Sequence, residues 1–471
     1  MNPQDARSPS TDALPDPLHP GRVRAMLADC VDWPADKTPR DIVIERCWPD
    51  RVGGITVEWS FKLPGDGTRT LFGTTGSSGR PPSPCSARAV ADFTDATRGV
   101  CVDAPGWNMQ VHSPDCDEKL PHLARCLDGH AMAERLAPVR ARLNGGTPVS
   151  VGHVQCRLLA YRPGRRAAIE FRPEGSGGIV LIGKTYADGR GEDLARLHEE
   201  LNRQIGWQSD RRVRVPVVVD YLPDLNMILF GHVRGRALTY TEGRAEDAAG
   251  RAIDAVSALH RCRIDALPAF TVSHECGILS RWHVLLGRMH PPMARRTRSL
   301  VDSLLGRSAL VERGTWCVAH RDFYEQQLIL GRRTTTILDL DTLALAHPCV
   351  DLGNFLAHLF LAGAALGWET TRFDAIAEHA IRRYRFEGRA VDPRALSFYT
   401  ASALFRVGAV HALRTRTCRF APALWALAEQ VAADGDRDWS RRRFRFLNPE
   451  KPHRLPPGEV RPPAFAVETL S

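Results

Sequence analysis

The chain has 471 residues, a length that predicts two or three compact units rather than one domain. Hydrophobic residues make up 43% of it, and 63 Lys+Arg against 54 Asp+Glu give a net charge of +9. This charge is a weak argument for nucleic acid, the first 21 residues lack the apolar run of a signal peptide, and no stretch of about 18 apolar residues is expected to span a membrane. We therefore expect a cytoplasmic protein with neither a nucleic-acid nor a membrane partner.

The twelve cysteines are scattered along the chain, and without an export signal they are expected to be reduced thiols. One segment, HSPDCDEKLPHLARC, combines metal-ligating residue types in His112, Cys116, His122 and Cys126. It lacks a tight C-x-x-C pair, and its prolines interrupt helical spacing. A zinc site is therefore not the favoured interpretation.

The first third of the chain offers little chemistry. Residues 1–20 are rich in Pro, Asp and Ser, which predicts disorder. Residues 21–145 alternate short strand-like runs with turn clusters such as GTTGSSGRPPSP. We expect an irregular β-containing extension there, with a helix over 129–143, and assign no role to it.

Residues 146–235 predict a β-rich lobe. QCRLLAYRPGRRAAIEFRP predicts two strands joined by a Pro-Gly turn, GGIVLIGKTYAD a third strand, and RVPVVVDYLPDLNMILFGHVRG two more. Between them, GEDLARLHEELNRQIG predicts a helix with Leu194, Leu197 and Leu201 on one face.

Residues 236–445 predict a mostly helical lobe, and residues 446–471 a Pro-rich tail over the surface. The strand signals of the helical lobe are TWCVAH, QQLIL and TTTILDLD. The expected fold class is thus α+β, with a β-rich lobe followed by a helical one.

The stretch AHRDFYEQQLILGRRTTTILDLDTL, residues 319–343, concentrates the polar chemistry. Phosphoryl transfer needs a group that positions the attacking hydroxyl, oxygen ligands for Mg²⁺, and a cation on the nucleotide phosphates. Asp322, in a loop, could accept the hydroxyl proton. Asp339, at the end of a β-branched run, and the amide oxygen of Gln327 could ligate Mg²⁺, which prefers hard oxygen ligands.

Lysine is rare in this chain, occurring at positions 37, 62, 119, 184 and 451. Lys184, inside a strand, is therefore conspicuous and could reach the α and β phosphates of a nucleotide. Glu200, in the next helix, could hold this lysine in place from the edge of the leucine face. Glu192 and Glu199 lie on the same helix and are alternatives.

At these residues, from about 150 to 440, the chain resembles the aminoglycoside phosphotransferase and choline kinase-like family, which has a protein-kinase-like fold. The family pattern is H-x-D-x-x-x-x-N, followed by an apolar strand that ends in an Asp metal ligand. Here His320, Asp322 and Asp339 match it. Gln327 departs from it, standing where the family usually has Asn, which puts the second metal site of the family in question more than the first.

The resemblance implies further roles. ATP and Mg²⁺ would be the cofactors, with the adenine against the LFGHV linker near His232 and Val233. His320 would brace the catalytic loop, and Asp351, in HPCVDLGNF, would hydrogen-bond it. The segment YRPGRRA occupies the place of the loop that covers the phosphates. Two of its arginines could contact phosphate or form a solvated turn.

The expected function is an ATP- and Mg²⁺-dependent phosphotransferase that acts on a hydroxyl of a small molecule. A catalytically inactive kinase fold used for binding is the alternative. A protein kinase is less favoured, because Tyr324 replaces the usual Lys, Leu340 and Asp341 follow Asp339 in place of D-F-G, and the A-P-E segment is absent.

The charge of the C-terminal region bears on the acceptor. Residues 356–471 contain 18 Lys+Arg and 12 Asp+Glu, and YTASALFRVGAVHALRTRTCRF has four arginines and no acid. Because buried ammonium groups need paired carboxylates, we expect a neutral or anionic acceptor rather than a polycationic aminoglycoside.

Overall fold

The structure is a computed structural model that describes residues 17–434, except 32, 34–37, 50–53, 65–66, 76–98, 148–151, 175–178, 209–211, 241–242, 312–314 and 389. The Pro-rich tail and almost all of the expected disordered N-terminus lie outside the described residues. Two compact units make up the chain, one of residues 1–116 with 413–416 and one of residues 117–412 with 417–471.

The first unit is a five-stranded antiparallel sheet in the order β1-β2-β3-β5-β4, joined by helix α1. Its elements are α1 (Pro20–Cys30), β1 (Arg40–Pro49), β2 (Ile55–Lys62), β3 (Thr68–Thr75), β4 (Cys101–Ala104) and β5 (Met109–His112). Trp59 is fully buried, and a Cβ on Gly73 would lie 2.1 Å from its ring, so only glycine lets the indole pack there. The expected β-containing extension is present, and its sheet is more regular than the sequence suggested.

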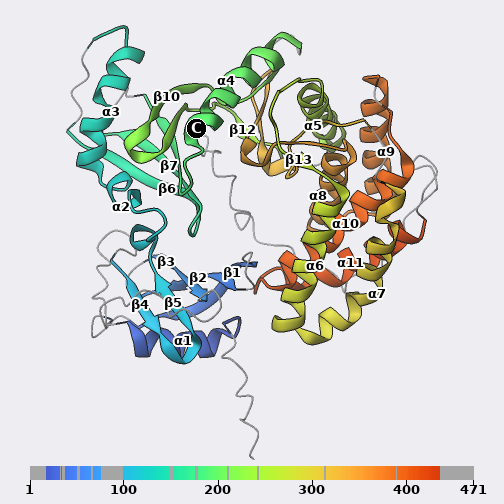
Figure 1. Ribbon diagram of the computed structural model, residues 1–471, viewed down its shortest axis with the longest axis horizontal. Coiled ribbons are helices and arrows are strands. Elements are labelled where there is room, and N and C mark those ends of the chain that lie inside the picture. Colours follow the sequence, from blue (N-terminus) through green and yellow to red (C-terminus); the bar gives the residue numbers. More distant parts are fainter. Residues whose placement is uncertain are drawn as a thin grey trace, which may run out of the picture. The chain divides into compact units, whose positions relative to one another are not determined.

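The second unit opens with an antiparallel sheet in the order β10-β11-β8-β7-β6, whose strands follow the expected segments. These strands are β6 (Val154–Arg162), β7 (Arg166–Pro173), β8 (Leu181–Tyr186), β10 (Val218–Leu222) and β11 (Met227–Gly231). Helix α4 (Gly191–Gln208) packs on this sheet through Leu194 and Ala195 (Figure 1). The short α2 (Leu123–Cys126) and α3 (Gly129–Leu143), which fall within the predicted extension, belong to this unit.

Helices dominate the rest of the second unit. They are α5 (Ala245–His260), α6 (Val272–Met289), α7 (Pro291–Arg307), α8 (Cys349–Leu366), α9 (Thr370–Phe386), α10 (Pro393–Ala412) and α11 (Ala421–Ala433). Helix α10 packs against α8 and α11, α5 against α9, and α6 against α7. The expected α+β class, with a β-rich lobe followed by a mostly helical lobe, is confirmed.

Short strands support the loops of the helical lobe in two small sheets, β12-β15-β16-β9 and β13-β17-β14. Their bounds are β9 (Val213–Arg214), β12 (Arg236–Ala237), β13 (Ala269–Phe270), β14 (Cys317–Ala319), β15 (Leu328–Leu330), β16 (Thr335–Ile337) and β17 (Ala344–Ala346). The three strand signals of the sequence are β14, β15 and β16. The other four are too short for a periodic pattern to reveal them.

One expectation needs correction. Cys101 is disulfide-bonded, so the expectation of reduced thiols is wrong at that position. Among the described residues, α8 is long and apolar enough to cross a membrane by length and composition alone, but 67% of it is buried in the fold. The buried core helix of a folded protein passes the same test, so the expectation of no spanning helix stays a prediction.

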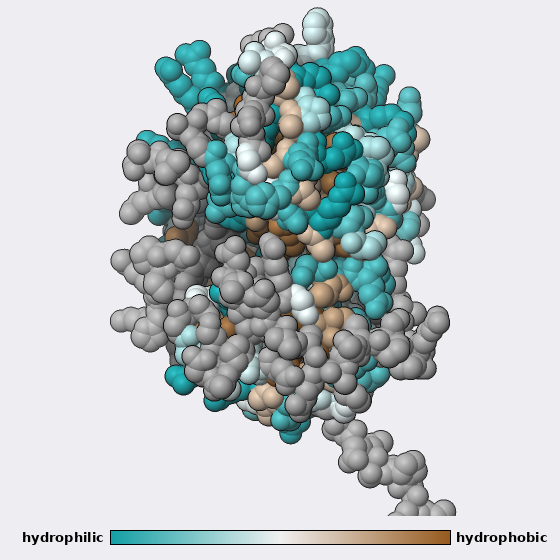
Figure 2. Space-filling view, turned by 90° about the vertical axis from the view of Figure 1, so that its left-hand side faces the viewer, coloured by the Kyte–Doolittle hydropathy of each residue, from teal (hydrophilic) through white to brown (hydrophobic). Residues whose placement is uncertain are grey.

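No zinc cluster forms within the described part of the chain, where no group of three His, Cys, Asp or Glu side chains could hold a metal ion. The His122 ring instead contacts the Thr185 hydroxyl at 2.6 Å. Among the residues that are coloured in Figure 2, hydrophilic ones predominate, with smaller apolar areas between them. Exposed apolar side chains of this kind are normal on folded proteins and mark no site by themselves.

Candidate active site

Asp351, the third residue of α8, holds the loop that follows β14 through hydrogen bonds to its backbone. Its carboxylate accepts hydrogen bonds from the backbone N–H groups of His320, at 2.7 Å, and Arg321, at 2.6 Å. His260 lies 2.9 Å from the same carboxylate, and both of these side chains are fully buried. The implied role of Asp351 in holding the loop agrees with these contacts.

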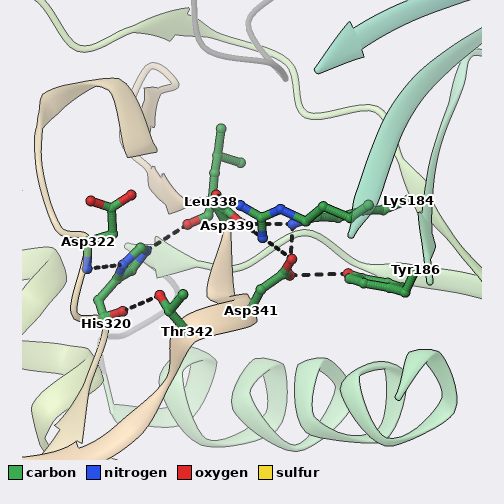
Figure 3. A network of polar contacts seen from close by, with 9 residues as sticks. Lys184, Tyr186, His320, Asp322, Leu338, Asp339, Asp341 and Thr342 are labelled. Atoms are coloured by element: carbon green, nitrogen blue, oxygen red, sulfur yellow. Dashed lines mark hydrogen bonds and ion pairs between the residues drawn. The ribbon is translucent and has the colours of Figure 1, made fainter. Parts of the chain in front are cut away.

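His320 braces the loop from within. Its Nδ1 accepts from the backbone N–H of Asp322 at 3.3 Å, so its Nε2 donates to the Leu338 carbonyl at 2.8 Å (Figure 3). The histidine thereby ties the residue that bears the candidate base to the strand end that precedes Asp339. In Figure 3 the Asp322 carboxylate makes no contact with the other residues drawn.

The surroundings of Asp322 act in opposite directions on the pKa of its carboxyl. Burial raises the pKa of its carboxyl above the ordinary value, while the positive charge of Arg406 opposes that shift. An acid whose pKa is raised in this way is a better proton acceptor than a solvated aspartate, because base strength follows pKa.

Two non-glycine residues of this site adopt the left-handed region of backbone conformation. Arg321 has φ 70° and Asp339 has φ 54°. Such conformations cost about 1–3 kcal/mol each, persist only where the surroundings enforce them, and cluster at functional sites. The Asp351 contacts enforce the first of them.

Four charged side chains meet where β16 ends. Lys184 Nζ, from β8, lies 2.7 Å from Asp339 Oδ1 and 2.7 Å from Asp341 Oδ1 (Figure 3). Arg166, at the start of β7, donates from its two Nη atoms to the two oxygens of Asp339, each at 2.9 Å, and also contacts Asp341. The side chains are 1–21% exposed, so the cluster is close to dry.

These pairs keep both aspartates ionised. Burial alone would raise the pKa of Asp339, but Arg166 and Lys184 hold it well below its usual range. The same two cations lower the pKa of Asp341. Of the arginines offered by the YRPGRRA segment, Arg166 is therefore part of the site, whereas Arg165 lies exposed on the turn.

The prediction that Glu200 holds Lys184 in place is wrong. Glu200 accepts from Arg203 Nη2 at 2.6 Å and from Gln204 on the exposed side of α4, and makes no contact with Lys184. Helix phase explains the error, because α4 turns His198 inward in its place. His198 is 3% exposed, its ring lies 4.7 Å from that of Phe230, and burial lowers its pKa to about 4.

Tyr186 adds a hydrogen bond that the sequence did not suggest. It is fully buried two residues after Lys184 on β8, and its hydroxyl donates to Asp341 Oδ1 at 3.1 Å. Strand alternation places residues 184 and 186 on the same face, so this signal was available from the pattern. Lys184 is thus held by aspartates of the helical lobe rather than by a glutamate of α4.

The remaining predicted residues are Gln327, Val233 and His232. Gln327 is buried. Its backbone carbonyl accepts a hydrogen bond from the backbone N–H of Leu338, the residue before Asp339, at 2.8 Å. Val233 packs against the apolar group that includes Ala168, Ile182 and Phe230. His232 Nε2 is buried without a hydrogen-bond partner, and burial lowers the pKa of the ring.

The donors present fit the expected cofactors. Mg²⁺ takes one or two carboxylates and completes its shell with phosphate and water, so ionised Asp339 and the Gln327 amide would suffice once Arg166 leaves Asp339. A neutral imidazole with an orphaned nitrogen, beside an apolar group, suits a heterocycle such as adenine, which offers both donors and acceptors. Asp341, Tyr186 and His198 are the site residues that sequence reasoning missed, and it did not single out Arg166 within the YRPGRRA segment.

No protein-family model and no curated protein matches the sequence, whereas solved structures do. A spectinomycin phosphotransferase in complex with ADP and spectinomycin has 11% identity and a TM-score of 0.44, over 65% of this chain and 97% of that one. A choline kinase from Cryptosporidium parvum has 11% identity and a TM-score of 0.44, over 64% and 95%. A macrolide 2'-phosphotransferase from Brachybacterium faecium has 15% identity and a TM-score of 0.40, over 64% and 98%. These similar structures are small-molecule phosphotransferases of the kind that the sequence resembles, and at such identities none of them identifies an acceptor for this chain.

Proposed function

We propose that this chain is an ATP- and Mg²⁺-dependent phosphotransferase that acts on a hydroxyl of a small molecule in the cytoplasm. One observation carries the proposal: Lys184 Nζ lies 2.7 Å from Asp339 Oδ1. Residues 155 positions apart in the chain thus supply a phosphate-binding cation and a metal-binding carboxylate in one place. The brace of His320 and Asp351 presents Asp322 beside them.

Each residue then has one task. Lys184 binds nucleotide phosphates, and Asp339 with Gln327 would hold Mg²⁺, which when bound neutralises phosphate charge. Asp322 orients the acceptor hydroxyl and takes its proton as the oxygen attacks the γ-phosphorus. The bond from that phosphorus to the β-phosphate oxygen breaks, and ADP leaves. His232 and Val233 would contact the adenine.

The alternative is a kinase fold that binds ligands without turnover. It is favoured by the Arg166 guanidinium, which occupies both oxygens of Asp339, and by Gln327 in place of Asn. A kinase fold without turnover would also bind nucleotide in a metal-dependent way. Nucleotide binding, its metal dependence and turnover must therefore all be measured to separate the two functions.

We expect Lys184→Ala to weaken binding of a non-hydrolysable ATP analogue, because it removes the phosphate-binding cation. Asp339→Ala should abolish the Mg²⁺ dependence of that binding. Calorimetry with and without Mg²⁺ measures both. Lys62→Ala, which removes a 66% exposed lysine of the first unit, is the control and should bind like the wild type. Isotherms of wild-type form for both site variants would overturn the roles assigned to Lys184 and Asp339 and would leave the inactive binding protein standing as the alternative.

We also expect neutral or anionic hydroxyl compounds to be better acceptors than polycationic aminoglycosides. Arg406 of α10 acts on Asp322 with its positive charge, and the Glu275 carboxylate on the opposite helix is already bonded to Ser402. A polycation would find few open carboxylates among these residues. Acceptor assays should compare kanamycin-like amines with neutral sugars and hydroxy acids. A kcat/KM of about 10⁵ M⁻¹s⁻¹ or more for the amines would overturn the expectation.

A further inference from the structure

Arg166 binds the carboxylate of Asp339, the residue that is proposed to ligate the metal ion. Its two Nη atoms each donate to a different oxygen of Asp339, at 2.9 Å, and one of them also contacts Asp341. A carboxylate offers about four acceptor positions, and Arg166 together with Lys184 occupies three of those of Asp339. A metal ion that binds Asp339 in this arrangement would lie directly beside two bound cations, so its binding is disfavoured until Arg166 leaves.

The position of Arg166 is imposed by the chain around it. Gly164, at the tip of the β6–β7 turn, donates its N–H to Asp117 at 2.6 Å, and the Tyr161 hydroxyl donates to the same carboxylate at 2.7 Å. Asp117 is itself buried. Because the turn is held in this way, release of Asp339 by Arg166 would require rotation of the arginine side chain rather than movement of the backbone.

The charges of the cluster determine when the Arg166 side chain would leave Asp339. Asp339 and Asp341 carry two negative charges, and Arg166 and Lys184 carry two positive ones, in a site with little solvent. A divalent cation added to this neutral group meets two competing cations. A metal that arrives with nucleotide phosphates brings its own negative charge, and a guanidinium pairs well with phosphate oxygens.

We propose that Arg166 and the divalent metal compete for Asp339, so that the site excludes free metal and accepts it only together with a nucleotide phosphate group, onto which the Arg166 guanidinium moves. The proposal rests on the assignment of Asp339 as the metal ligand made above, and is independent of turnover. Metal and nucleotide then strengthen each other's binding by the same factor, as linkage requires.

The test measures Mn²⁺ binding without nucleotide, by the electron paramagnetic resonance signal of free Mn²⁺. Wild-type protein should bind Mn²⁺ weakly, and Arg166→Met should bind it on the order of tenfold more tightly or better, because one of two competing cations is gone. Arg165→Met removes the neighbouring exposed arginine and should behave like the wild type. Wild-type Mn²⁺ binding as tight as that of Arg166→Met would overturn the proposal, as would an equal gain in Arg165→Met.

A second measurement covers the case in which Arg166→Met does not fold, since an unpaired buried carboxylate is destabilising. Wild-type protein is titrated with Mn²⁺ with and without ADP, and ADP should tighten Mn²⁺ binding well beyond what Mn²⁺ and ADP achieve in solution. Equal binding with and without ADP overturns the proposal. An inactive binding protein would still show the Arg166→Met effect, so a failure of the proposed function is distinguishable from a failure of this inference.

Discussion

Asp322→Asn should lower turnover by about 10²-fold or more while leaving the affinity for Mg-ATP nearly unchanged, a range typical of the loss of a general base. Asparagine keeps the shape of the side chain but cannot take the hydroxyl proton. The loop itself should survive, because His320 and Asp351 contact its backbone rather than the Asp322 carboxylate.

Steady-state kinetics with an identified acceptor, together with calorimetry for Mg-ATP, measures the two effects separately. Glu325→Gln removes another carboxyl from the same loop and should retain turnover. If Asp322→Asn folds, binds Mg-ATP and turns over at the wild-type rate, Asp322 is not the base.

The pH profile gives an independent check. Burial raises the pKa of Asp322, and a base works only in its ionised form. The wild-type rate should therefore rise with pH through that raised pKa and level off above it. Asp322→Asn should lose this acidic limb along with most of the rate.

Much of this site could be predicted because its parts are local. The β6–β7 hairpin follows from alternation around a Pro-Gly turn, and the spacing of Asp322 and Asp339 within 319–343 lies on one continuous stretch of chain. Lys184 was conspicuous because lysine is rare. Each of these signals needs only neighbouring residues.

The errors concern partners that are distant in sequence. Arg166 and Asp339 are 173 positions apart, and no local pattern says which of several arginines reaches a carboxylate. The error in helix α4 is of another kind, because the phase of this helix could have been predicted from the sequence. His198 follows Leu194 by four residues and precedes Leu201 by three, so it lies on the buried stripe that Glu200 misses. A carboxylate was expected beside the lysine, whereas the stripe carried a neutral imidazole.

The second large effect is expected at Asp351, where substitution should destabilise the fold as well as the loop. Its carboxylate joins His320 and Arg321 of the loop to His260 of α5, and the His260 ring lies 2.7 Å from the Tyr384 hydroxyl of α9. Burial alone would lower the pKa of His260, but its neighbours Cys317, Tyr384 and Asp351 hold it well above the usual value. The pair is therefore a buried salt bridge near neutral pH.

The pH window for the test follows from the two shifts. The pKa of Asp351 is lowered in the fold, so its contribution is present above about pH 4 and is lost as pH falls through the lowered value. The pKa of His260 is raised, so its contribution is fully present below about pH 6.5 and is lost as pH rises through the raised value. Both contributions are present at pH 6.

At that pH, Asp351→Asn should lower the free energy of unfolding by about 3–5 kcal/mol, the usual result of breaking a buried ion pair by removing one partner. Chemical unfolding of the whole chain measures the change. Asp254→Asn is the matched control, because Asp254 likewise accepts hydrogen bonds through both oxygens, from the Arg383 guanidinium at 2.6 and 2.7 Å, but these two side chains are 36% and 42% exposed. Exposed pairs contribute about 0–1 kcal/mol, so the control should unfold almost like the wild type. Equal losses in the two variants would mean that burial of the Asp351 network adds nothing to stability, and that the catalytic loop is held by other contacts.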